Sequence, residues 1–323
     1  MKIVFVLPEI NLSGGTKVLI DYADYLKSAG HSVVCLVPRP ARIGLRALAR
    51  MIVRGESRRP VDRRRSHLSG RDVDIVEGKV PGRLVESDFP DADVVIATWW
   101  ETAEWIAPLG PEKGVKVHFI QGHEVFDGQP VDRVEAVYRL DLKRIVVAQW
   151  LQDVMRDSYG CSDAVLVPNG VRTGHFAASA SGTVRAREVG LVWSNEPIKN
   201  CAMAIAAMDL ARQHMPDLRL VAFGSEPCPG ELARQDWVEY FERPAQSLIP
   251  QIYARARLWL FPTLTEGFGL PILEALACGT PVVATAAGAA PQIVSDRNGR
   301  LVETTPSAMA EAMVDLLRLP EQR

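Results

Sequence analysis

The feature that most constrains the fold is a regular alternation of short apolar runs with helical patterns. Bare apolar runs occur at 3–7, 32–37, 94–98, 117–120 and 145–148, and again at 189–193, 218–223, 258–261 and 281–285. Such runs are typical of parallel strands that are buried on both faces. After the first run, apolar residues recur at helical spacing from Val18 to Ala29, and Gly30 ends the pattern. The sequence therefore predicts an α/β protein with doubly wound parallel sheets.

The two series of strands predict two domains, which also fits a chain of 323 residues. Between them lies a small, polar stretch at 177–183, typical of a linker. We expect an N-terminal Rossmann-like domain at 1–176, a linker at 177–184 and a C-terminal Rossmann-like domain at 185–323.

Charge and cysteine content exclude several classes of protein. The chain has 37 Lys and Arg against 39 Asp and Glu, which argues against nucleic-acid binding through bulk charge. The five cysteines are scattered without CxxC spacing, so we expect neither a disulfide framework nor a structural zinc site. No apolar run approaches the roughly 18 residues of a spanning helix, and the apolar N-terminus is too short for a signal peptide. We expect a cytoplasmic protein.

One segment departs from this pattern, because residues 39–71 hold eleven arginines and only two acids. We call Arg42, Arg46, Arg50 and Arg54, which fall four apart, the arginine stripe. Apolar residues at 43, 47, 48, 51 and 52 lie on other faces of the predicted helix. The segment is either an interfacial helix that binds anionic lipid on the inner face of the cell membrane or a solvated helix. Nucleic acid is not an expected partner, since no aromatic residues interleave the arginines.

The densest candidate site follows the strand predicted at 258–261. In parallel sheets ligands bind beyond the carboxyl ends of the strands. Gly267 and Gly269 precede a helix that Pro271 is suited to begin, so their amides form a site for phosphate. Glu274, one turn inside the helix, is placed to bind the paired hydroxyls of a ribose, and Glu266 to bind a second polyol. Together these features indicate a sugar nucleotide.

The segment from Glu266 to Glu274 resembles the E-x7-E motif of retaining glycosyltransferases of the GT-B fold, family 4 (glycosyl transferases group 1). Ser13-Gly14-Gly15 resembles the family's N-terminal glycine loop, Lys199-Asn200 its lysine motif, and Gly288 its last glycine loop. The stretches 98–103 and 119–124 are similar to a bacterial, rhamnosyltransferase-like subgroup that builds cell-surface glycans. The resemblance implies two Rossmann-like domains that face each other across a cleft.

The resemblance also implies an activity, the retaining transfer of a hexose from a nucleotide diphosphate sugar to a hydroxyl of a glycan or a lipid-linked acceptor. Three residues would serve catalysis: Lys199 neutralises the diphosphate, while Glu266 and His123 contact the donor sugar. The implied donor-binding residues are Gly14, Gly15, Lys199, Gly267, Phe268, Gly269, Leu270, Glu274 and Gly288. The implied acceptor-side residues are Trp99, Trp100, Glu101 and Glu124.

No metal and no cofactor beyond the nucleotide sugar are expected. The D-x-D pairs Asp72/Asp74 and Asp91/Asp93 fall at the beginnings of strands, away from the predicted ligand edge. The chain also departs from the family pattern, because Ser194 stands where an arginine is usual. Two other functions therefore stay open. One is a sugar-nucleotide epimerase or inverting transferase on the same fold, and the other is a weakly active regulatory partner of a transferase.

Overall fold

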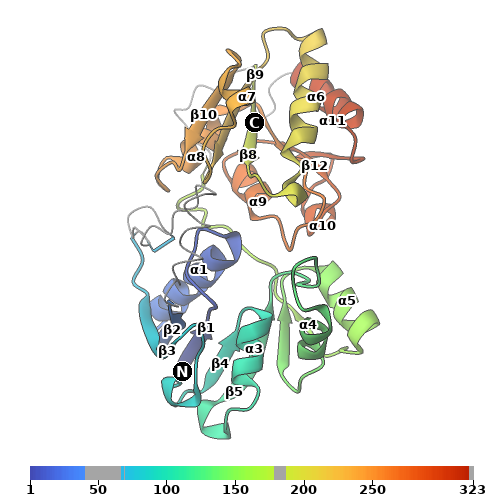
Figure 1. Ribbon diagram of the computed structural model, residues 1–323. Helices are drawn as coiled ribbons and strands as arrows, with labels where there is room; N and C mark the ends of the chain where they lie inside the picture. The colour runs from blue at the N-terminus through green and yellow to red at the C-terminus, as the bar shows by residue number, and fades with distance from the viewer. Residues whose placement is uncertain (41–66, 69, 178–186, 320–323) are drawn as a thin grey trace, which may run out of the picture. The chain divides into compact units, whose positions relative to one another are not determined.

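The structure is a computed structural model that describes residues 1–40, 67–68, 70–177 and 187–319 (Figure 1). The chain divides into two compact units, Met1–Pro168 and Asn169–Arg323. The arginine stripe and most of the predicted linker lie outside the described residues. The division between the units falls eight residues before the boundary expected at 176. Phe176 is buried in the core of the second unit, 6.1 Å from Tyr253 between ring centroids, so the preceding segment folds with that unit.

The first unit contains a parallel sheet of seven strands in the order β3-β2-β1-β4-β5-β6-β7. Its strands are β1 (Lys2–Val6), β2 (Ser32–Arg39), β3 (Asp74–Pro81), β4 (Val94–Ala97), β5 (Val115–Ile120), β6 (Lys143–Val146) and β7 (Val165–Leu166). Its helices are α1 (Gly14–Ser28), α3 (Trp100–Ile106), α4 (Val131–Tyr138) and α5 (Gln149–Tyr159), with the short 3-10 turns η2 (Glu86–Asp88) and η3 (Pro111–Lys113).

The second unit contains a parallel sheet of six strands in the order β10-β9-β8-β11-β12-β13. Its strands are β8 (Glu188–Trp193), β9 (Arg219–Gly224), β10 (Val238–Glu242), β11 (Leu258–Phe261), β12 (Val282–Thr285) and β13 (Gly299–Val302). Its helices are α6 (Cys201–His214), α7 (Gly230–Ala233), α8 (Ile249–Arg255), α9 (Leu270–Ala277), α10 (Ala290–Ile293) and α11 (Pro306–Arg318), with the turn η4 (Pro197–Lys199).

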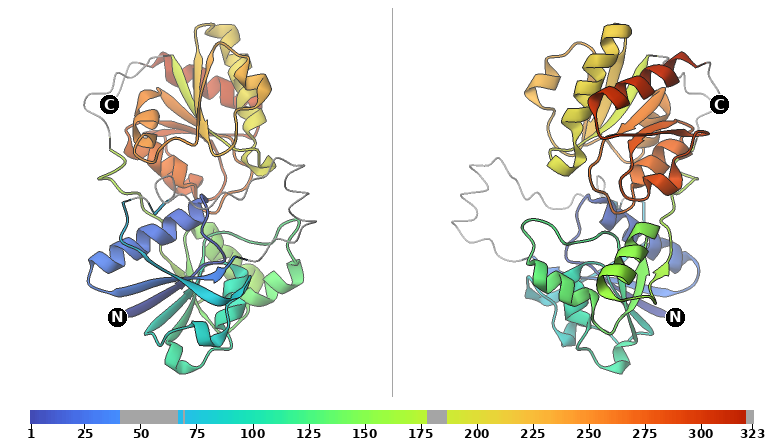
Figure 2. Two further views of the ribbon diagram at one scale, coloured as in Figure 1. Left: turned by 60° about the vertical axis from the view of Figure 1, so that its left-hand side comes forward. Right: turned by 90° about the vertical axis from the view of Figure 1, so that its right-hand side faces the viewer.

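Both units confirm the predicted fold class, two doubly wound parallel sheets. The first strand of each unit, β1 or β8, lies inside its sheet. The next two strands along the chain extend the sheet to one edge, and the remaining strands extend it from the other side of the first strand. Helices lie on both faces of each sheet (Figures 1 and 2). This topology leaves a switch point beside the first strand of each unit, where ligands bind in folds of this kind.

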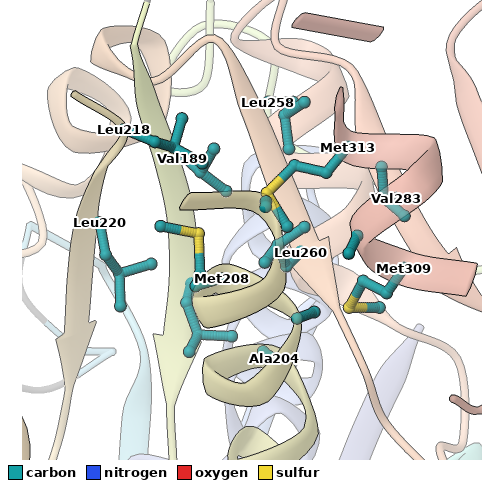
Figure 3. Close-up of a cluster of buried hydrophobic side chains, with 14 of the residues drawn as sticks. Val189, Ala204, Met208, Leu218, Leu220, Leu258, Leu260, Val283, Met309 and Met313 are labelled. Carbon is teal, nitrogen blue, oxygen red and sulfur yellow. The ribbon is translucent and has the colours of Figure 1, made fainter. Parts of the chain in front are cut away.

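Two apolar layers enclose the sheet of the second unit. On one face, Met208 of α6 and Met309 and Met313 of α11 pack against strand residues such as Leu220 and Leu260 (Figure 3). On the other face, residues of α8 and α9 pack against the aromatic side chains of β11. Burial of this kind contributes about 1.5–3 kcal/mol for each large apolar side chain, and it holds the carboxyl ends of the strands in place.

Local signals set the two ends of α1, the first helix of the first unit. Ser13 caps α1, because its hydroxyl accepts a hydrogen bond from the Thr16 amide at 3.2 Å. The chain leaves α1 through Gly30, whose φ of 88° lies in the left-handed region. In the part of the chain that the structure describes, no helix is both long and apolar enough to cross a membrane.

Candidate functional site

A small pocket of about 80 Å³ opens at the switch point of the second unit. It lies at the carboxyl ends of β8 and β11, which are neighbours in the sheet although they are far apart in the sequence. Val192 and Ser194 line one side, and residues after β11 and β12 line the others. This is the position where a doubly wound sheet binds its ligand.

The glycines of the motif shape this pocket. Gly269 lines it and precedes α9 with a φ of 100°, a left-handed conformation that favours glycine. Pro271 stands in the first turn of α9, where its missing amide hydrogen costs nothing. A Cβ on Gly288 would lie 2.8 Å from the carbonyl oxygen of Glu266, so only glycine fits there without a shift. The glycine at the amino end of α9 therefore forms part of the pocket wall.

An ion pair crosses the pocket. Lys199 Nζ lies 2.6 Å from Glu266 Oε2, and the Gly267 amide donates to Glu266 Oε1 at 3.2 Å. The two side chains are 30% and 26% exposed, so both can be reached by a ligand. A cation, a backbone amide and a helix amino end in one small pocket form a site for an anion. In this structure the Glu266 carboxylate holds two of those groups.

Glu274 is not one of the residues that line this pocket. It is 7% exposed, and its Oε2 accepts a hydrogen bond from the Tyr253 hydroxyl at 3.0 Å. Burial raises the pKa of Tyr253 well above its usual value, and the nearby Glu274 carboxylate raises it further. Tyr253 therefore stays protonated and donates to Glu274. A buried carboxylate needs such donors to offset its desolvation.

The structure brings together three of the predicted donor residues, since Lys199, Glu266 and Gly269 all line the pocket. Phe268 and Leu270 are buried beneath the loop. Ser194 does line the wall, at the position where the resemblance expects an arginine. Sequence reasoning missed Thr285 and Ile272 as wall residues. The carboxyl end of the strand predicted at 281–285 was the available signal for Thr285.

In the first unit, the predicted glycine loop begins α1. Gly14 is the first residue of the helix, and a Cβ on Gly15 would lie 3.4 Å from the side-chain nitrogen of Gln121. Gln121 follows β5, so the loops after two strands of this sheet meet at the carboxyl edge. A Cβ at position 15 would make an ordinary van der Waals contact with Gln121.

His123 lies near the same edge, with a defined partner. Its Nε2 is 2.7 Å from the Tyr159 hydroxyl, and its ring stacks on Tyr138 at 5.8 Å between centroids. Burial lowers the pKa of His123 below its usual value. The imidazole is therefore neutral at pH 7 and oriented by Tyr159, a partner that sequence reasoning did not find.

The predicted acceptor-side residues divide into two kinds. Trp100 and Glu124 are buried, whereas Trp99 and Glu101 are partly exposed. The Trp100 amide donates to Glu124 Oε2 at 2.8 Å, so the carboxyl caps the start of α3. Burial raises the pKa of Glu124 to about 8. Trp99 is half-buried, and its ring lies 6.5 Å from the exposed ring of Phe126, which the sequence did not single out.

The two D-x-D pairs have partners within the first unit. Asp72 and Asp74 each bind Lys27 at 2.9 Å, and Asp91 binds Lys113 at 2.9 Å. No cluster of three His, Cys, Asp or Glu side chains with metal-binding geometry occurs within 1–40, 67–68, 70–177 and 187–319. These aspartates form ion pairs at the amino ends of strands.

Comparison with known proteins identifies the relatives of this chain. Residues 188–319 match the family described as glycosyl transferases group 1. The chain is 32% identical, over 262 residues, to the GDP-mannose-dependent alpha-(1-6)-phosphatidylinositol monomannoside mannosyltransferase of Mycolicibacterium smegmatis. That alignment covers 69% of this chain and 68% of the relative.

Two further similarities differ in extent. The chain is 43% identical to O-antigen chain mannosyltransferase B of Escherichia coli over 63 residues, which is 20% of this chain and only 16% of that relative's length. Sucrose-phosphate synthase from Thermosynechococcus elongatus has a similar structure, with a TM-score of 0.74 at 17% identity. That similarity covers 98% of this chain and 90% of the other, and it shows a shared fold.

Proposed function

The chain belongs to the family of glycosyl transferases group 1 and has the GT-B fold, and from this premise we propose that it transfers a hexose from a nucleotide diphosphate sugar. The acceptor is a hydroxyl of a glycan or of a lipid-linked glycan, and the anomeric configuration is retained. The products serve cell-surface polysaccharide or glycolipid synthesis.

One observation carries this proposal, the meeting of Lys199, Glu266 and the amino end of α9 in a single pocket. A diphosphate carries the negative charge that Lys199 and the amides attract. Glu266, once displaced from Lys199, is left beside the phosphates as an acceptor for sugar hydroxyls. A site that binds phosphate and a polyol side by side suits a nucleotide sugar.

The same groups assist departure of the nucleotide. When the glycosidic bond to phosphate breaks, negative charge develops on the phosphate oxygen that leaves. Lys199 and the amides at Gly269 and Leu270 stabilise that charge where it forms, which is the largest single contribution in many enzymes. We assign no protein nucleophile, and we assign Gly14 and Gly15 to the diphosphate.

The remaining residues have positioning roles. His123, neutral and held by Tyr159, contacts the donor sugar. Trp99 and Glu101 contact the acceptor, whereas Trp100 and Glu124 hold the start of α3 in place. Glu274 binds the ribose, and the Tyr253 hydroxyl holds its carboxylate in place.

The relatives indicate which donor to test first. One is named as GDP-mannose-dependent, and two are named as mannosyltransferases. GDP-mannose is therefore the first candidate donor, ahead of UDP- and dTDP-sugars. The transfer needs no divalent metal, because Lys199 and amides neutralise the phosphates.

The test is a donor screen followed by product analysis. Thermal shift with GDP-, UDP- and dTDP-sugars should identify one nucleotide that stabilises the chain, because a ligand that binds only the folded state raises its stability. Incubation with that donor and a short α-mannoside should then yield, by NMR, a product with the anomeric configuration of the donor, which is α from GDP-α-mannose. A product of the opposite anomeric configuration would indicate an inverting transferase, and an altered free donor would indicate an epimerase.

The serine at position 194 favours a second candidate function. Without the arginine that the family usually has at this position, the phosphates have one cation fewer, which favours a weakly active regulatory partner of a neighbouring transferase. Ser194→Arg separates the two proposals. A transferase that lacks this cation should become faster, whereas a regulatory partner should stay inactive with every donor.

We also propose that the chain acts at the inner face of the cell membrane, bound peripherally through the arginine stripe. Lipid-linked acceptors reside there, and basic residues near an anionic surface contribute about 1 kcal/mol each.

A further inference from the structure

A hollow in the first unit lies along α3. It has a volume of about 560 Å³, within the range of about 300–1,000 Å³ typical of ligand sites. Its walls come from the segment 82–86, from α3 and the residues after it, and from Arg133 of α4. Helices α3 and α4 lie side by side (Figures 1 and 2). Nothing in the proposed donor chemistry uses this hollow.

Two charged groups in the wall are held by no hydrogen bond or ion pair among the described residues. Arg83 is exposed, and it forms no ion pair with a described carboxylate. Glu101 is partly buried and accepts no hydrogen bond from any residue within the described ranges. Burial raises the pKa of Glu101, and the nearby charge of Arg133 partly offsets this rise. Both groups can therefore bind a ligand without breaking a hydrogen bond within the chain.

A third charged group is fixed rather than free. Arg133 donates from Nε to Glu104 Oε1 at 2.7 Å and from Nη2 to Glu104 Oε2 at 2.5 Å. Its guanidinium lies 4.8 Å from the centre of the Trp100 ring. This bidentate pair fixes one wall of the hollow. Its remaining N–H groups can donate and its remaining lone pairs can accept, so the pair favours neither an anionic nor a cationic ligand.

The balance of groups selects a neutral, hydroxyl-rich ligand. Two arginines and three glutamates line the hollow, so a phosphate meets too many carboxylates and a cation meets two guanidinium groups. Sugar hydroxyls both donate and accept, so they match such a mixture. Trp105 and Leu84 add apolar surface on which the C–H face of a sugar ring can pack.

The location connects the hollow with the acceptor residues. Helix α3 begins at Trp100, three residues after β4 ends at the carboxyl edge of the sheet. Glu101, in its first turn, is both a predicted acceptor-side residue and a wall residue. The hollow continues along the helix to Leu109. A glycan that reaches Glu101 with its reacting end can extend its next sugars into the hollow.

We propose that this hollow is a distal glycan subsite, which binds the sugars of the acceptor that precede the one receiving the new residue. The inference rests on the proposed transferase function, which it deepens by making the acceptor an oligosaccharide. The subsite gives longer acceptors a lower KM, because their extra sugars contact Arg83 and Trp105.

The experiment measures binding and transfer separately in the full chain. Binding of mono- to tetrasaccharides of mannose, galactose and rhamnose is followed by saturation-transfer NMR without nucleotide. Arg83→Gln and Trp105→Ala should each weaken binding of the preferred tetrasaccharide about tenfold, the effect of one lost charged hydrogen bond or ring contact. Arg297→Gln, the same change at an exposed arginine of the second unit, is the matched control and should have no effect.

The kinetic readout separates this subsite from the active site. Both variants should raise the KM for the tetrasaccharide and leave transfer to the monosaccharide unchanged. Arg83→Gln changes an exposed side chain, so it tests the subsite even if Trp105→Ala fails to fold. Transfer to short acceptors without oligosaccharide binding, or with binding that neither variant weakens, overturns the subsite alone. Oligosaccharide binding without any transfer overturns the transferase proposal instead.

Discussion

Replacing Glu266 by glutamine gives the sharpest test of the donor pocket, because this carboxylate and an incoming phosphate compete for the same groups. Glu266 accepts from Lys199 at 2.6 Å and from the Gly267 amide at 3.2 Å. Glutamine keeps the size and one carbonyl acceptor but has no charge. We expect Glu266→Gln to bind a free nucleoside diphosphate more tightly and to transfer sugar more slowly from the full donor.

The magnitude follows from the geometry. Two unit charges about 5 Å apart repel by roughly 3 kcal/mol at an effective dielectric constant of about 20. Lys199 and Glu266 are 30% and 26% exposed, so solvent screens this repulsion, and the ion pair lost on binding is itself weak. The net gain should be about 1 kcal/mol, which is a roughly fivefold lower Kd.

Isothermal titration calorimetry with GDP and UDP measures this gain. It should shrink as salt is added, because it depends on the repulsion between partly exposed charges. Glu303→Gln, the same change at an exposed carboxylate outside the pocket, controls for net charge. An unchanged or higher Kd for Glu266→Gln at low salt would refute the idea that the carboxylate occupies the phosphate site.

Four further predictions concern other parts of the chain. Glu274→Ala should weaken binding of the nucleoside diphosphate by about 1–3 kcal/mol, measured by calorimetry. It should also lower the melting temperature, because the Tyr253 hydroxyl loses its acceptor, whereas Glu274→Gln should leave the melting temperature unchanged. Burial raises the pKa of Glu124 from 4.5 to about 8, so its contribution to the free energy of unfolding is full below about pH 4.5 and is lost as pH rises through about 8. In urea titrations the free energy of unfolding of the parent should therefore fall by up to about 5 kcal/mol over this range. The Glu124→Gln variant should show little of this fall. EDTA should leave transfer unchanged, and activity restored only by manganese or magnesium would contradict the metal-free site. Co-sedimentation with anionic liposomes should occur at low salt and disappear when the arginine stripe is replaced by glutamine; a parent chain that ignores such liposomes would show the stripe to be a solvated face.

The central strands of both sheets could be predicted from the sequence, and the edge strands mostly could not. Each predicted apolar run is a strand of the structure, such as β8 and β11. Strands β3, β7, β10 and β13 had no apolar run to mark them, and each lies at the edge of its sheet. An edge strand has one neighbour and is less buried, so its residues need not be uniformly apolar. β10, for example, reads Val-Glu-Tyr-Phe-Glu.

The site was predictable where backbone geometry fixes residue type, and less so where side chains choose partners. Gly269 could be placed because the start of the following helix favours a glycine there, and Lys199 because its motif resembles that of the family. The burial of Glu274 and Glu124 could not, since it depends on Tyr253 and Trp100, which come from other elements. Sequence spacing gives the order of elements along the chain, but it does not show which donor a carboxylate meets across a loop.

The glycines of this site also help to position a carboxylate, that of Glu266, besides leaving room for a phosphate. Gly288 leaves room for the Glu266 carbonyl, and the Ala289 amide donates to the Phe268 carbonyl at 3.0 Å, so the loop after β12 holds the loop after β11. The Glu266 side chain is thereby kept within reach of Lys199. A methyl group at position 288 would push this loop by several tenths of an ångström and displace the carboxylate, so Gly288→Ala should impair transfer through Glu266 although residue 288 itself does not line the pocket. The last glycine loop therefore supports the loop that carries Glu266, and its conformation links two strands of the sheet to the Glu266 carboxylate.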